Sequence, residues 1–139
     1  RCEAYNRPIE SRALRALKVR RDTAEDVFAR VEVREEATSR LIASFVPHIE
    51  VVDYEPKARV RIPPSMFPSQ FPVAMFFRAG QNAATAGGEP ADAEDLEPGE
   101  YRVTVTVFSG EAEFRTDRLL VIGKTAEGTF WGRALPPRR

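Results

Sequence analysis

Hydrophobic and polar residues alternate most regularly between Leu96 and Ile122, and this alternation predicts a β-hairpin. A Pro-Gly turn at 98–99 comes first, because proline presets one dihedral angle and glycine tolerates positive φ. The inward positions of the two predicted strands are Tyr101, Val103, Val105 and Val107, followed by Ala112, Phe114 and Thr116. A period of two is typical of a strand that is buried on one face only.

The Ser-Gly dipeptide at 109–110 predicts the register of this hairpin. If these residues form a two-residue loop, Val107 faces Ala112 and Val105 faces Phe114. The polar residues of both strands then share the opposite face, as an edge hairpin of a sandwich requires.

Alternating or continuous apolar residues predict further strands along the chain. These strands cover residues 14–20, 27–34, 49–54, 58–62, 73–77, 119–122 and 129–133. A capping box at 23–26 would instead open a helix over 27–34. A strand is favoured there because Val27, Val31 and Val33 are β-branched and would lie on no single stripe of a helix.

Residues 40–46 allow two interpretations. Four apolar residues there have helical spacing, namely Leu41, Ile42, Phe45 and Val46. This spacing favours a short helical turn ahead of Pro47, a residue that does not continue a helix comfortably. A continuous strand over 40–46 is the alternative.

Together these elements predict an all-β fold, an immunoglobulin-like β-sandwich of about seven to eight strands. The single domain would span residues 13–135, after a flexible basic segment at 1–12 and before a tail at 136–139. Within the domain, small and acidic residues at 83–99 predict a long mobile loop.

One turn and strand of the chain resemble the last strands of immunoglobulin-like and prealbumin-like sandwich domains. The matching run is Pro98-Gly99-Glu100-Tyr101-Arg102-Val103-Thr104-Val105-Thr106-Val107, followed by the strand that ends at Ile122. The chain has no cysteine pair, which excludes an antibody-type domain. The resemblance implies an adhesion, scaffolding or assembly role rather than catalysis, although a fold alone assigns no function.

Composition excludes several classes of function. Basic and acidic residues balance at 21 each, whereas a nucleic-acid surface needs a basic excess. The single cysteine, Cys2, allows neither an intrachain disulfide nor a cysteine metal cluster. The single histidine, His48, supplies neither a catalytic triad nor a histidine zinc site. No apolar run reaches the roughly 18 residues of a membrane span, and no cofactor is expected.

Met66, Phe67 and Phe71 are the first candidate interaction residues. They lie in a segment, 63–72, that holds four prolines, and a stiff segment presents apolar side chains at low entropic cost. Exposed apolar patches often mark interfaces. The alternative is that these side chains fold back and close the open end of the sandwich.

Asp92, Glu94 and Asp95 in the predicted loop are candidates for docking a basic surface of a partner. Their spacing does not match an EF-hand, and the required central glycine is missing. A solvated loop is therefore the alternative. Trp131, the only tryptophan, is assigned first to the core or to an edge strand, and second to a ligand platform.

These features predict a non-catalytic protein–protein interaction or assembly module within a larger cell-envelope or secreted protein. Its partner would be another protein or a second copy of the chain, in the periplasm, at the cell surface or outside the cell. Two other classes stay open: a structural subunit of a virus or phage particle, and a carbohydrate-binding or accessory domain of an enzyme.

Overall fold

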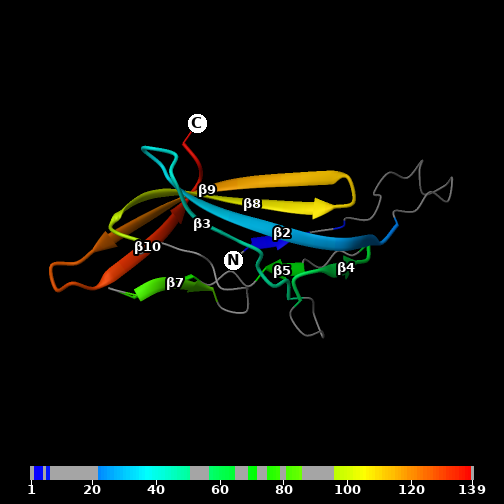
Figure 1. The fold of residues 1–139 in the computed structure, drawn as a ribbon, viewed down its shortest axis with the longest axis horizontal. Helices are drawn as coiled ribbons and strands as arrows, with labels where there is room; N and C mark the ends of the chain where they lie inside the picture. The colour runs from blue at the N-terminus through cyan, green and yellow to red at the C-terminus, as the bar shows by residue number, and fades with distance from the viewer. Residues whose placement is uncertain are drawn as a thin grey trace.

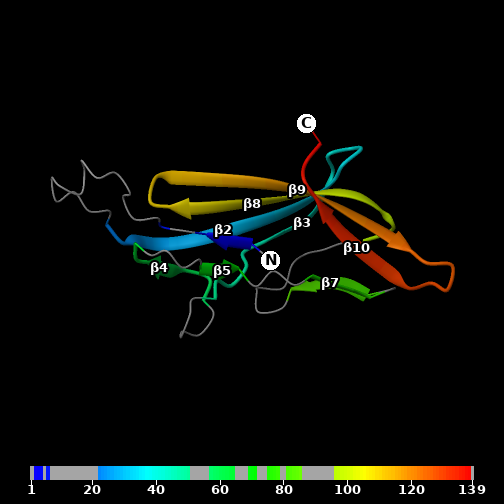
Figure 2. The same ribbon diagram turned by 180° about the vertical axis from the view of Figure 1, so that it is seen from behind.

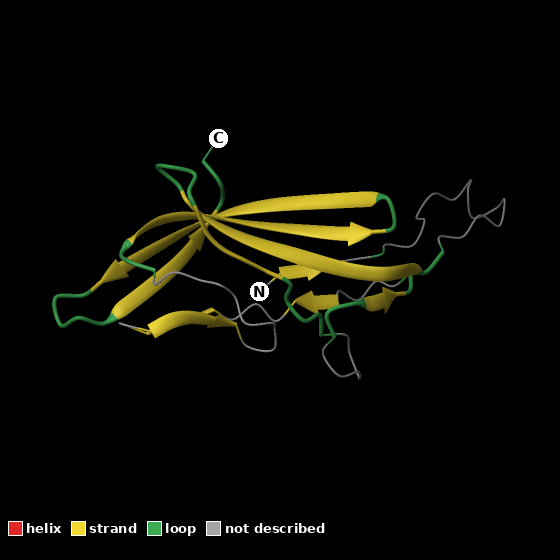
Figure 3. Cartoon of the chain, in the orientation of Figure 1, coloured by secondary structure: helices red, strands yellow, loops and turns green. Residues whose placement is uncertain are grey.

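The computed structural model describes residues 2–4, 6, 22–50, 57–64, 69–71, 75–78, 81–85 and 96–138. Its regular elements in these ranges are all strands (Figure 3), which confirms the predicted all-β class. The strands are β1 (Cys2–Ala4), β2 (Ala24–Glu35), β3 (Leu41–Phe45), β4 (Val60–Ile62), β5 (Ser69–Phe71), β6 (Met75–Arg78), β7 (Gln81–Thr85), β8 (Gly99–Ser109), β9 (Ala112–Lys124) and β10 (Phe130–Leu135). Within the described ranges there is no helix that could cross a membrane.

Six strands form one antiparallel main sheet (Figures 1 and 2). Its order is β10-β9-β8-β2-β3, and β4 pairs with β2 beside this path. Two smaller antiparallel pairs are β1–β5 and β6–β7. In both views β2 runs between the β8–β9 hairpin and the group formed by β1, β4 and β5. Strand β2 is therefore the centre of the described fold.

The alternation of β2 places its alanine and valines on one face of the main sheet and Arg30 and Glu32 on the other. Ala29, Val31 and Val33 are fully buried, and the residues between them are charged. Val31 lies opposite Val105 of β8, and Val33 lies opposite Val103. Such cross-strand pairs of β-branched residues stabilise the sheet where it is buried.

Two groups of side chains cover this apolar face. The first group is Ala29, Val31, Phe45, Ile49 and Val105. The second group is Val33, Ile42, Ala43, Leu96, Tyr101 and Ile122. Both groups use residues from β3 and from the segments beside it, so the core lies over the middle and one end of the sheet.

The expected helical turn over 40–46 is wrong, and the alternative strand is what forms. Ala43 pairs with Val33 but Leu41 pairs with Arg34, so Ile42 is an extra residue in β3, as in a β-bulge. The bulge lets the consecutive residues Ile42 and Ala43 both be buried. The helix-like spacing of Leu41, Ile42, Phe45 and Val46 therefore reflects an irregular strand.

The predicted β8–β9 hairpin forms, but its register differs by two residues. Val107 lies opposite Phe114, and Ser109 lies opposite Ala112, so the loop is Gly110-Glu111. Gly110 has a φ of +57° and is the first central residue, as in type II′ turns. Because the shift is even, each residue keeps the face that the alternation predicted.

The other predicted strands are described in part. Residues 27–34 and 119–122 lie in β2 and β9, and residues 129–133 overlap β10. Residues 58–62 overlap β4, and Ile49 forms an isolated bridge with Lys57. Residues 73–77 overlap β6, and β7 occupies the start of the predicted 83–99 loop. Residues 7–21, 51–56 and 86–95 lie outside the described part, and with them the strand at 14–20.

Replacing Gly110 with alanine is expected to destabilise the protein by about 1–2 kcal/mol, the cost of a left-handed conformation for a residue with a Cβ. An added Cβ would meet no atom within 4 Å, so the cost would be purely conformational. Urea unfolding of the wild type and the variant measures it. Glu111→Ala is the control and should lose clearly less, because residue 111 does not have a positive φ; equal losses for both variants would contradict the assigned turn.

Candidate functional site

A groove of about 580 Å³ opens beside the apolar side of the β8–β9 hairpin. Its lining comes from the chain start, β2, β4 and the hairpin: Glu3, Ala4, Asn6, Ala24, Val27, Ile62, Val105, Val107, Ser109, Ala112, Phe114, Arg115 and Thr116. Ligand sites are commonly concave, largely apolar and of 300 to 1,000 Å³, roughly this size. This groove is therefore the candidate functional site.

The hairpin wall of the groove continues the core-facing side of β8 toward the turn. Val105 is buried in the core, Val107 is half-buried and Ala112 is exposed. Phe114, opposite Val107, is 62% exposed. The alternation that buries the middle of the hairpin thus places an exposed aromatic side chain at its far end.

The opposite wall is held by backbone pairing and by one buried amide. Val27 and Ile62 are buried and belong to the paired strands β2 and β4. The Asn6 side chain donates hydrogen bonds from Nδ2 to the carbonyl of Asp22 (3.0 Å) and to that of Ile62 (2.8 Å). Asn6 therefore links the segment after β1 to the last residue of β4, and these hydrogen bonds hold this wall of the groove in place.

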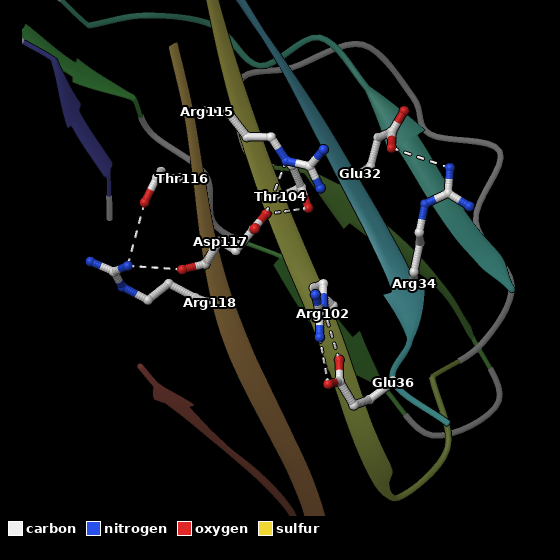
Figure 4. A network of polar contacts seen from close by, with 9 residues as sticks. All are labelled: Glu32, Arg34, Glu36, Arg102, Thr104, Arg115, Thr116, Asp117 and Arg118. Carbon is white, nitrogen blue, oxygen red and sulfur yellow. Dashed lines mark hydrogen bonds and ion pairs between the residues drawn. The ribbon is translucent and has the colours of Figure 1, made fainter. Parts of the chain in front are cut away.

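The other face of the main sheet carries a network of polar contacts (Figure 4). Thr104 Oγ1 donates a 2.7 Å hydrogen bond to Asp117 Oδ1 across the β8–β9 pair, and Arg115 Nε approaches the same oxygen at 3.4 Å. Burial raises the pKa of Asp117, but the hydrogen bond from Thr104 and the charge of Arg115 outweigh it, so the pKa is lowered. The network makes this face a stabilised polar surface.

A second contact on this face joins β8 to the β2–β3 turn. Arg102 donates hydrogen bonds from Nε (3.0 Å) and Nη2 (2.7 Å) to the two carboxylate oxygens of Glu36. The hydrogen bond from Arg102 lowers the pKa of Glu36 and the same bond raises the pKa of Arg102. Such a bidentate pair fixes geometry as well as charge.

Trp131 lies at the opposite end of the sheet from the groove's hairpin tip. It pairs with Gly123 in the β9–β10 register and is 49% exposed. A Cβ added to Gly123 would collide with Cζ2 and Cε2 of the Trp131 ring. The indole therefore lies directly over the glycine, which explains why this strand position of β9 has no side chain.

The structure does not bring the sequence-predicted site residues together. Trp131 is on the edge strand β10, as the first assignment expected. Phe71 is in β5, opposite Cys2 of β1. Met66, Phe67, Asp92, Glu94 and Asp95 lie outside the described residues, and their roles stay predictions.

Sequence reasoning missed the groove. It placed Phe114 correctly on the apolar face of the hairpin, but alternation does not reveal whether another layer covers that face. The Thr104–Asp117 contact was missed because it depends on the register, which moved by two residues. The correct register follows from the sequence if Gly110 is placed at the first central position of the turn, instead of the second.

No group of three or more metal-ligating side chains lies together within the described ranges. No protein-family model, curated protein or solved structure matches this chain. A functional assignment therefore depends on the geometry of the groove.

Replacing Asp117 with asparagine is expected to remove at most about 1 kcal/mol of stability at neutral pH, because the carboxylate is only partly buried. A lowered pKa in the folded state stabilises the protein above the unfolded pKa of about 3.9 and no longer does so as the pH falls through the folded pKa. The difference in unfolding free energy between wild type and variant should therefore shrink below about pH 4. Urea titrations from neutral to acid pH measure it, and a difference independent of pH would contradict the assignment.

Replacing Gly123 with alanine is expected to expel the Trp131 ring and to destabilise the protein by about 1–3 kcal/mol, the usual cost of overpacking. Because Trp131 is the only tryptophan, a red shift of the fluorescence emission would report its move into water. Gly132→Ala is the matched control, since its added Cβ would meet Leu120 at an ordinary 3.8 Å. An unchanged spectrum for Gly123→Ala would refute the placement of the ring.

Proposed function

We propose that this chain is a non-catalytic protein–protein interaction module that binds an extended, apolar segment of a partner protein in the groove. The observation that carries the proposal is the uncovered apolar end of the β8–β9 hairpin, where Phe114 is 62% exposed. A large, exposed aromatic side chain beside a concave apolar surface is a common feature of interfaces.

The shape of the groove favours an extended occupant. Its hairpin wall runs from Val105 to Ser109, about 13 Å at roughly 3.3 Å per residue. That length suits four or five residues of an extended segment. Because strand side chains alternate, such a segment would place every second side chain against Val107 and Phe114. The partner's segment would therefore have alternating apolar and polar residues.

The rigidity of both walls supports binding without chemistry. The β8–β9 hairpin is fixed by continuous pairing from Gly99 to Ser109, and Asn6 ties the other wall to Ile62. A preformed groove loses little conformational entropy when a ligand binds. Most of the lining is aliphatic or aromatic, with polar side chains at Glu3, Asn6, Ser109, Arg115 and Thr116, so the groove offers mainly apolar contact area.

The wider prediction of a cell-envelope or secreted parent protein stays part of this proposal. The described residues form an antiparallel main sheet and two smaller strand pairs. That these belong to an immunoglobulin-like sandwich is also part of the proposal. The two other classes, a particle subunit and a carbohydrate-binding domain, are separate outcomes of the experiment that follows.

An array of ten-residue peptides with alternating apolar and polar residues tests the proposal, with affinities measured by fluorescence anisotropy. Saturable binding is expected for the wild type. Phe114→Asp should weaken it at least tenfold, about 1.4 kcal/mol, because the carboxylate would be desolvated in the groove. Phe114→Leu should retain most of the affinity.

Leu41→Asp is the matched control, because Leu41 is also a large exposed apolar residue, at 43%, but lines no part of the groove. It should bind like the wild type. Peptide binding that is absent, or unaffected by Phe114→Asp, would refute the proposal. Saturable binding of a glycan instead would favour the carbohydrate-binding class, and a high-order oligomer would favour the particle subunit.

A further inference from the structure

Strand β10 forms one edge of the main sheet (Figure 1). Among the described elements it pairs with β9 and with no other strand. The outer side of an edge strand presents a row of backbone N–H and C=O groups, which is a template for another strand. This surface is separate from the groove, which contains no residue of β10.

The β9–β10 register identifies which backbone groups point outward. The amide of Thr125 donates a 2.8 Å hydrogen bond to the carbonyl of Thr129, and this pair continues the β9–β10 register. In antiparallel strands, alternate residues direct both backbone groups toward the same neighbour. The groups of Thr129, Trp131 and Arg133 therefore face β9, and those of residues 130, 132 and 134 point away from it.

A second copy of β10 fits this edge best in an antiparallel register centred on Gly132. Gly132 then lies opposite its own counterpart, and Phe130 lies opposite Ala134 of the second copy. Every outward residue of β10 is used, and each pair exchanges two hydrogen bonds. A register centred on Arg133 would oppose two like charges and would place Phe130 against Pro136, which has no N–H.

The side chains are also self-complementary in this register. Trp131 of each copy lies opposite Arg133 of the other, on one face, in a non-hydrogen-bonded pair, where side chains come closest. Trp131 is half-exposed, and its ring lies over Gly123 on the β9 side of β10, so Arg133 of the second copy would extend across β10 to reach it. Arg133 is exposed and makes no ion pair with the described residues. A guanidinium group over an indole gains a cation–π interaction, and the two-fold symmetry would form it twice.

We infer that two copies of this chain associate through β10, across a two-fold axis at Gly132, so that the two main sheets become one continuous sheet. The interface is isologous and closes at the dimer. It does not depend on the proposed function, because the groove lies on other strands.

Cysteine cross-linking tests the register, with Cys2→Ser as the background in every variant. The expected Cα–Cα distance between the two Gly132→Cys residues is about 5.5 Å, which suits a disulfide. In the same register, two Arg133→Cys residues would be about 8 Å apart and two Ala134→Cys residues about 14 Å apart, both too far. Mild oxidation should therefore give at least tenfold more covalent dimer for Gly132→Cys than for the two controls.

Sedimentation velocity over a range of protein concentrations tests the association itself. The wild type should form a dimer, and Ala134→Pro should shift it to the monomer, because proline removes an outward N–H that β9 does not use. At a protein concentration low enough for the wild type to be monomeric, the thermal melting of Ala134→Pro and its peptide binding in the groove should match those of the wild type.

Three results would overturn the inference. One is a wild type that stays monomeric up to its solubility limit, as expected if Arg133 protects the edge from pairing. Another is a folded Ala134→Pro variant that remains a dimer. The third is equal cross-linking of all three cysteine variants, which decides the matter even if Ala134→Pro fails to fold.

Discussion

The valine pairs between β2 and β8 are the interaction on which the rest of the described structure depends. Val31 and Val33 meet Val105 and Val103 at the centre of the main sheet, and both β2 valines are fully removed from water. Each edge of the sheet is built outward from this pair of strands, with β3 and β4 on β2 and with β9 on β8. Loss of these pairs would separate the two halves of the core.

The same constraint explains why the groove lies where it does. The core groups cover the sheet near Phe45, Ile49 and Tyr101, whereas the hairpin extends beyond them to its turn at Gly110 (Figure 2). A strand pair long enough to support the sheet therefore presents apolar residues past the limit of the core. The continuous pairing of β8 with β9 fixes this end of the hairpin, and the exposure of Phe114 leaves it as a preformed apolar surface.

Periodicity in the sequence predicted the all-β class and the faces of the hairpin, because side-chain alternation is a local property of the backbone. It did not predict the register, since the position of Gly110 in the turn shifts all pairs by two residues. It also misread the bulge at Ile42 as a helical turn, because a bulge is decided by the neighbouring strand. The exposure of Phe114 was beyond such reasoning, because burial depends on segments far away in the chain.

The pairing of β2 with β8 has a consequence for the route by which the chain folds. Paired residues in these strands are separated by 66 positions for Glu35 and Tyr101 and by 80 for Phe28 and Phe108, whereas β8 and β9 are joined by a tight turn. Closing a long segment costs entropy before its contacts form. The β8–β9 hairpin, like the β2–β3 and β9–β10 pairs, joins strands that are neighbours in the sequence. The long-range pairing of β2 with β8 is therefore the step that we expect to limit the rate of folding.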